Sequence, residues 1–263
     1  MSGNHAARLA ALRHPPAEVA ARAGRIYRAV LGGSARLRAG NFEALGVTDL
    51  RLLFALYDFE FFDGLLGAML RDAGAGEVEF RLSARMTRAA GKTIYRKVRE
   101  RVGARVVERP AFEIAISTLL LFQTFGDVDR PVTVGGLACR DRLEALQRIF
   151  EHELLHLAEF LTTGRSSCSA EPFRRLSRDL FGHAGVVHDL VTPREVAART
   201  LAVQTGDRVS FDLDGATRSG VVNRITKRAT VLVEDPAGRP FSDGRRYLTY
   251  YVPLPLLRKD GPA

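Results

Sequence analysis

Residues 141–164 read DRLEALQRIFEHELLHLAEFLTTG, and this stretch carries the clearest structural and functional pattern in the sequence. Apolar side chains recur in it every three or four positions, which is the spacing of one face of an α-helix. Asp141 is suited to cap the first turn, with Glu144 three residues later, and Gly164 is suited to end the last turn. The stretch therefore predicts one helix that runs to about Leu161.

Within this stretch, residues 152–156 read His-Glu-Leu-Leu-His. Positions i and i+4 of a helix lie on one face about one turn apart, so His152 and His156 can bind the same tetrahedral zinc ion. Glu153 then lies beside the ion, where it can accept a proton from zinc-bound water and pass it to a leaving amine. The motif predicts a Zn²⁺ cofactor and metallopeptidase chemistry, with Glu153 as the catalytic residue. The alternative is a pair of packed or solvated helix histidines.

Two histidines leave a catalytic zinc site one protein ligand short. Cys168 lies just before a helix that we expect to begin near Glu171, and a helix N-terminus favours the thiolate form that binds metal. We therefore expect Cys168 to be the third metal ligand. Glu171, His183 and His188 are the alternatives, in which case Cys168 is a buried thiol.

The rest of the first 200 residues is expected to mix helices with a small sheet. Helical spacing predicts further helices at residues 16–30, 48–57, 59–70 and 171–181. Alternating apolar residues predict strands at 77–83 and 112–117, and the basic segment 85–109 between them reads as strands turning near Ala90-Gly91 and Gly103. We expect three or more antiparallel strands.

The predicted secondary structure changes from helices to short strands after Gly206. Short strands separated by turn residues are predicted at 208–213, 219–225, 230–234 and 247–252. This spacing is typical of a small barrel of SH3 or KOW type. The predicted fold class is α+β, with a basic N-terminal helical arm at 1–44, a catalytic domain at 45–200 and a small all-β barrel at 204–260.

Composition limits the class of protein. The chain has 263 residues, of which 46% are hydrophobic and 26% charged, which excludes a disordered or fibrous protein. It has no run of 18 apolar residues, and its first 16 residues lack the apolar stretch of a secretory segment. Cys139 and Cys168 are too few for a disulfide framework. We expect a cytoplasmic protein with free thiols and no membrane partner.

Positive charge is concentrated in three segments of a chain whose net charge is +9. Residues 1–40 carry 7 Arg against one Glu, residues 85–109 carry 9 basic and 2 acidic side chains, and residues 204–263 carry 10 basic and 7 acidic side chains. Such segments suit phosphate backbones, so DNA or another polyanion is one expected partner. A solvated basic surface is the alternative.

Four strings in order resemble the SprT-like zinc metallopeptidase domain over about residues 45–185. They are Phe61-Phe62-Asp63-Gly64-Leu65, residues 85–93 (RMTRAAGKT), residues 113–117 (EIAIS) and the motif at residues 152–156. The resemblance implies a zincin-like fold of helices with a small antiparallel sheet. It also implies His152 and His156 as zinc ligands and Glu153 as general base. The family includes the Spartan proteases, which act on proteins crosslinked to DNA.

The chain departs from the family at the third ligand. The family usually supplies it from a string His-Gly-x-x-Phe or His-Gly-x-x-Trp, and the matching stretch here is Ser169-Ala170-Glu171-Pro172-Phe173. Two functions are therefore expected as alternatives. The first is a zinc endopeptidase that acts on a protein or peptide substrate, including DNA-associated or crosslinked proteins. The second is a catalytically weak or inactive relative that binds nucleic acid or protein. In the second, the C-terminal barrel would carry the binding through Arg224, Lys227, Arg228, Arg245 and Arg246.

Overall fold

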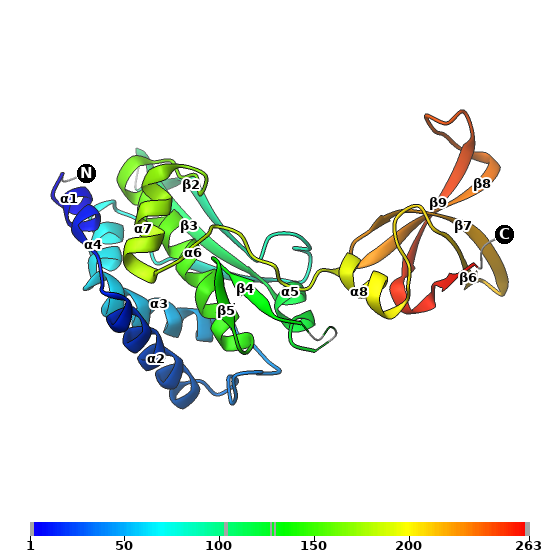
Figure 1. Ribbon diagram of the computed structural model, residues 1–263. Helices are drawn as coiled ribbons and strands as arrows, with labels where there is room; N and C mark the ends of the chain where they lie inside the picture. Colours follow the sequence, from blue (N-terminus) through cyan, green and yellow to red (C-terminus); the bar gives the residue numbers. More distant parts are fainter. Residues whose placement is uncertain (1–2, 103–104, 127, 129, 261–263) are drawn as a thin grey trace. The chain divides into compact units, whose positions relative to one another are not determined.

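The computed structural model describes residues 3–102, 105–126, 128 and 130–260. Helices and several small sheets are mixed along the chain, so the α+β class expected from the sequence is confirmed (Figure 1). Contacts between Cα atoms divide the chain into two compact units. Unit 1 comprises residues 1–125 and 130–190, and unit 2 comprises residues 126–129 and 191–263.

Unit 1 contains most of the helices. They are α1 (Gly3–Ala11), α2 (Pro16–Gly33), α3 (Val47–Phe62), α4 (Leu65–Asp72), α5 (Thr118–Gln123), α6 (Arg142–Thr163) and α7 (Glu171–Phe181). The first two lie in residues 1–44, the segment expected to be a basic helical arm. In the structure α2 packs on α3 and α6, because its apolar face buries Ile26 and Val30 completely. The basic N-terminal segment is therefore part of the core of unit 1.

The main sheet of unit 1 has three strands in the order β1-β3-β2: β1 (Glu79–Ser83), β2 (Gly91–Val102) and β3 (Arg105–Ser117). β2 pairs with β3 in the antiparallel direction, but β1 pairs with β3 in the parallel direction. The expectation of an antiparallel sheet was wrong for β1, because the apolar β3 takes the centre and binds β1 on its other side. The turn expected at Gly103 lies outside the described residues.

The helix that carries the motif is the centre of unit 1. Asp141 caps α6 as expected, since its side chain accepts a hydrogen bond of 2.9 Å from the backbone N–H of Glu144. Gly164 ends the helix in the left-handed conformation, with a φ of 72°. The helix contacts β2 on one side and α7 on another, and β4 (Val132–Val134) and β5 (Leu137–Cys139) form a small hairpin beside it. These neighbours hold the motif between the sheet and α7.

Unit 2 has its own core. It contains α8 (Pro193–Thr200), β6 (Arg208–Leu213), β7 (Ala216–Ile225), β8 (Arg228–Pro240), β9 (Arg246–Pro253), the 3₁₀ turn η1 (Leu254–Leu256) and β10 (Arg258–Lys259). The strands form one antiparallel sheet in the order β10-β6-β7-β8-β9. Among the described residues, the outer strands β9 and β10 do not pair, so no closed barrel is formed. Ala197 of α8 packs into the core of this sheet.

Across the described ranges, none of the helices combines the length and the apolar character that crossing a membrane requires.

Candidate metal centre

The two motif histidines face each other on α6. The Nε2 atoms of His152 and His156 are 3.1 Å apart, and both side chains are half-buried. Phe173 of α7 packs against both imidazoles, with ring centroids at 4.9 Å and 4.6 Å. The turn of helix between the two residues and this aromatic wall fix the direction of both rings. The nitrogen atoms therefore converge on one point.

Cys168 completes a group of three possible ligands. It lies in the loop between α6 and α7, and one ligand atom from each of Cys168, His152 and His156 lies within 4.8 Å of the others. The ligand atoms of a tetrahedral zinc ion with bonds of about 2.0 to 2.3 Å lie roughly 3.5 Å apart, which is close to the spacing of this group. Over the residues that the structure describes, this is the only such group. Two nitrogen ligands and one sulfur ligand fit Zn²⁺.

Burial keeps both imidazoles in the form that binds metal. It lowers the pKa of His152 to about 3, with a further contribution from the neighbouring His156, and it lowers the pKa of His156 to about 4. Both rings are therefore neutral at pH 7, and each has a nitrogen lone pair to offer.

A hydrogen-bonded chain behind His156 selects the nitrogen that faces the cluster. The Ser166 hydroxyl donates to Oε2 of Glu159 at 2.5 Å, and its oxygen lies 2.6 Å from Nδ1 of His156. Since the hydroxyl has given its proton to Glu159, its oxygen accepts the Nδ1–H of His156, and the Nε2 lone pair is left for the metal. Glu159 and Ser166 were not predicted from the sequence. Their only signal was a position within one turn or one loop of the motif.

Glu153 lies against β2. It is 4% exposed, and the Thr93 hydroxyl lies 2.8 Å from its Oε2 and donates to it. Burial raises the pKa of Glu153 to about 7, although the hydrogen bonds from Thr93 act in the opposite direction. Gly91 leaves room for this carboxylate, because a Cβ there would lie 2.5 Å from Oε1 of Glu153. A carboxyl with this pKa can both accept and release a proton at neutral pH.

The motif opens into a cavity of about 140 Å³. His152 and Glu153 line it together with Gly91 at the start of β2 and with His183 and His188 from the segment after α7. The candidate base and one candidate ligand therefore share an accessible space.

The structure does not bring the three alternative ligands into the cluster. Nε2 of His183 lies 2.7 Å from Oε2 of Glu151, and the imidazole Nε2 of His188 lies 3.0 Å from the carbonyl oxygen of Arg88, to which it donates. Glu171 is exposed, with a carboxylate oxygen 3.9 Å from the guanidinium of Arg178. Cys168 is the residue that the geometry favours as third ligand.

A buried network around Glu151 is the second feature that was not predicted from the sequence. Glu151 is completely buried, and its carboxylate accepts hydrogen bonds from Tyr57 at 2.8 Å, from Arg148 at 2.8 Å and from His183 at 2.7 Å. Burial alone would raise the pKa of Glu151, but Arg148 and His183 hold it below its usual range. Glu151 lies on the apolar side of α6, where a buried charge needs partners. A charged residue on the apolar face was the one signal in the sequence that could have indicated this network. The network ties the segment after α7 to the helix that carries the motif.

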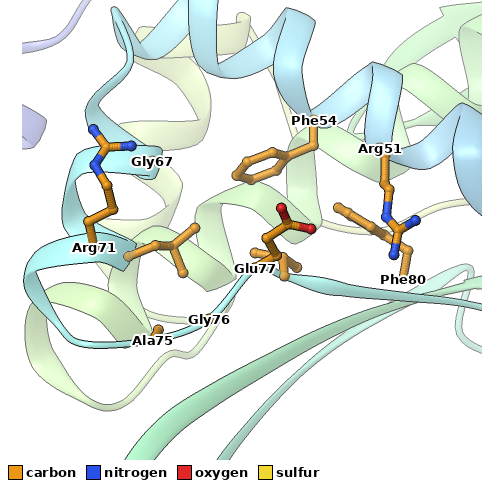
Figure 2. Close-up of a pocket in the computed structure, with 10 residues that line it drawn as sticks. Arg51, Phe54, Gly67, Arg71, Ala75, Gly76, Glu77 and Phe80 are labelled. Atoms are coloured by element: carbon orange, nitrogen blue, oxygen red, sulfur yellow. The ribbon is translucent and has the colours of Figure 1, made fainter.

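A larger cavity of about 480 Å³ lies elsewhere in unit 1, among α3, α4 and the start of β1. Figure 2 shows Arg51 and Arg71 on opposite sides of it, with Glu77 between them and Phe54 and Phe80 in its wall. It shares no lining residue with the cavity at the motif. It therefore takes no part in the candidate metal centre.

Comparisons with known proteins leave the interpretation to the site itself: no family model, curated protein or solved structure matches this chain.

Proposed function

We propose that this chain is a zinc-dependent endopeptidase whose catalytic unit is SprT-like. The observation that carries the proposal is the convergence of His152, His156 and Cys168 beside the buried carboxyl of Glu153. Neutral imidazoles, a thiol and a nearby base with a pKa of about 7 are the groups that metal-assisted hydrolysis requires.

Each residue has one task in this proposal. His152, His156 and Cys168 would hold the ion, which when bound polarises the substrate carbonyl and acidifies a water molecule. Glu153 accepts the proton of that water and then donates it to the nitrogen of the leaving amine. Thr93 keeps the carboxylate oriented, since its hydroxyl donates to the oxygen Oε2 of Glu153.

The edge of the sheet offers a place for an extended substrate. β2 begins at Gly91, beside Glu153, and among the described residues it pairs only with β3. Its outer edge therefore has free backbone N–H and C=O groups, which a peptide in extended conformation can pair with. This pairing would bring the scissile bond to the motif.

A second candidate function is binding of nucleic acid, which would also direct the peptidase to DNA-associated proteins. Lys97, Arg101 and Arg105 on the β2–β3 hairpin are exposed and make no salt bridge with a described residue. Unit 2 adds basic residues to a sheet that we propose is related to SH3 or KOW barrels. Positive surfaces of this kind bind phosphate backbones in a salt-dependent way.

The test of the peptidase function is the substitution Glu153→Gln, with the exposed Glu171→Gln as matched control. We expect Glu153→Gln to keep zinc and to lose cleavage of an unfolded protein substrate by at least a hundred-fold, because the general base is removed. Glu171→Gln is expected to cleave at the parental rate. Cleavage by Glu153→Gln at that rate would refute the mechanism, and salt-sensitive DNA binding without any cleavage by the zinc-loaded parent would favour the second function.

A further inference from the structure

The sheet of unit 2 presents an exposed tyrosine on the face that is turned away from its core. Tyr251 of β9 is 68% exposed, whereas its chain neighbours Tyr250 and Val252 belong to the core of unit 2 or pack against it. Successive side chains of a strand point to opposite faces of the sheet, so Tyr251 points outward. No ring of another described residue stacks on it. Its aromatic face is therefore open to a ligand.

The register of the strands places two arginines on the same face as this tyrosine. Tyr251 pairs with Thr230 of β8, and Thr230 pairs with Arg224 of β7. Paired residues of antiparallel strands share a face, and neighbouring strands lie about 4.8 Å apart, so the Cα atoms of Tyr251 and Arg224 are roughly 10 Å apart. Arg228 lies two residues before Thr230 and opposite Pro253, which puts it on this face as well. These five residues are called the outer patch below.

The positive charge of the outer patch is not compensated locally. Arg224 and Arg228 are exposed, as is Lys227 in the turn between β7 and β8, and none of the three forms a salt bridge with a described residue. The chain has no acidic side chain at residues 215–233 or 244–259, which include every residue of the patch. The patch therefore attracts an anionic partner.

An open aromatic ring beside unpaired cations suits single-stranded nucleic acid better than other polyanions. A nucleic-acid base has a flat π face that stacks on a tyrosine ring, and the phosphates on either side of it require cations. In a duplex the faces of the bases are covered by their neighbours, so Tyr251 would have no base to stack on. An acidic peptide would use the arginines and leave the ring without a partner.

We propose that the outer patch of unit 2 binds single-stranded nucleic acid, with one base stacked on Tyr251 and the neighbouring phosphates on Arg224 and Arg228. The proposal rests on the second candidate function, nucleic-acid binding, and assigns that function to one face of the chain and to one form of nucleic acid. DNA and RNA both supply bases and phosphates, so both are tested as the source.

Fluorescence anisotropy with the full-length protein tests the proposal without any cleavage. The labelled probes are oligothymidylate and oligouridylate of about 12 nucleotides, a DNA duplex of the same length and a polyglutamate peptide, each titrated at several salt concentrations. The variants are Tyr251→Ala, Tyr251→Phe and the double variant Arg224→Gln/Arg228→Gln. The matched control is Arg194→Gln/Arg199→Gln, which removes the same charge from exposed positions of α8, a helix that packs on the core side of the sheet through Ala197.

We expect Tyr251→Ala to weaken binding of the single strands at least five-fold, because stacking on the ring is lost, and Tyr251→Phe to stay within about two-fold of the parent. The double variant Arg224→Gln/Arg228→Gln should also lower the slope of log Kd against log salt concentration by about 1.4, since each phosphate contact contributes about 0.7. The control on α8 should keep the parental slope. The tighter of the two oligonucleotides identifies DNA or RNA as the source.

Three results would overturn the proposal. They are parental affinity of Tyr251→Ala for single strands, equal effects of the two arginine double variants, and binding of the duplex or of polyglutamate at least as tight as that of the single strands. Nucleic-acid binding that every variant retains would refute the outer patch but leave the second candidate function to another part of the chain. A parent that binds no nucleic acid would refute both.

Discussion

The buried carboxyl of Glu153 makes the stability of the metal-free protein depend on pH in a way that one substitution removes. Burial raises the pKa of Glu153 from an ordinary 4.5 to about 7. Between these values the folded state keeps a proton that the unfolded state has released. The contribution of this proton to the free energy of unfolding is complete below pH 4.5 and is lost as the pH rises through 7. At pH 8 the loss in the free energy of unfolding is about 3 kcal/mol.

Glu153→Gln replaces the carboxyl with a neutral group of the same shape, so the variant does not undergo this loss. Urea unfolding in the presence of a chelator, followed by circular dichroism at 222 nm, gives the free energy of unfolding at pH 5 and pH 8. All other groups titrate alike in both proteins, so the difference between them isolates Glu153. From pH 5 to pH 8, we expect the free energy of unfolding of the parent to fall by about 2 to 3 kcal/mol more than that of the variant. A difference that does not change with pH would show that the carboxyl is not buried as described.

Three further substitutions test other parts of the site. Gly91→Ala is expected to keep zinc and to lower kcat/KM at least ten-fold, because the added Cβ would lie 2.5 Å from Oε1 of Glu153. Gly76→Ala is the control, since a Cβ at Gly76 has open space around it. Equal activity of the two variants would contradict the role of Gly91 in leaving room for the carboxylate. Ser166→Ala should weaken zinc binding about ten-fold in competition with a chelator, since it removes the group that orients a ligand, and unchanged affinity would refute that role. Tyr57→Phe should lower the free energy of unfolding by about 1 to 3 kcal/mol in urea, because a buried carboxylate loses a donor. A change below about 0.5 kcal/mol would contradict the network.

Local signals in the sequence were sufficient for the elements that carry the site. The cap at Asp141 and the glycine at Gly164 set the ends of α6, and α7 has the expected bounds, Glu171–Phe181. Spacing within one helix also put the two motif histidines on one face. These features depend on residues within a few turns of one another, which is why pattern and capping rules predict them.

Features that depend on distant residues were predicted less well. The parallel pairing of β1 with β3 is set by which strand takes the centre of the sheet, and nothing in residues 79–83 encodes that choice. Residues 1–44 read as a basic helical arm because residues 1–40 carry 7 Arg against one Glu, but the buried face of α2 packs on α3 and on the distant α6. Two partners of Glu151, Tyr57 on α3 and His183 after α7, are distant in the sequence, so the sequence could flag this residue only as a charge in need of partners.

Zinc content tests the central claim most directly. Elemental analysis of the purified protein is expected to find about one zinc per chain at pH 7, and much less in His156→Ala and Cys168→Ala, since each removes one of three ligands. The exposed Ser169→Ala, beside Cys168, is the matched control and should keep the metal. Protein that holds no zinc even after reconstitution would contradict the account, and zinc lost with His156→Ala but kept in Cys168→Ala would contradict the assignment of the third ligand.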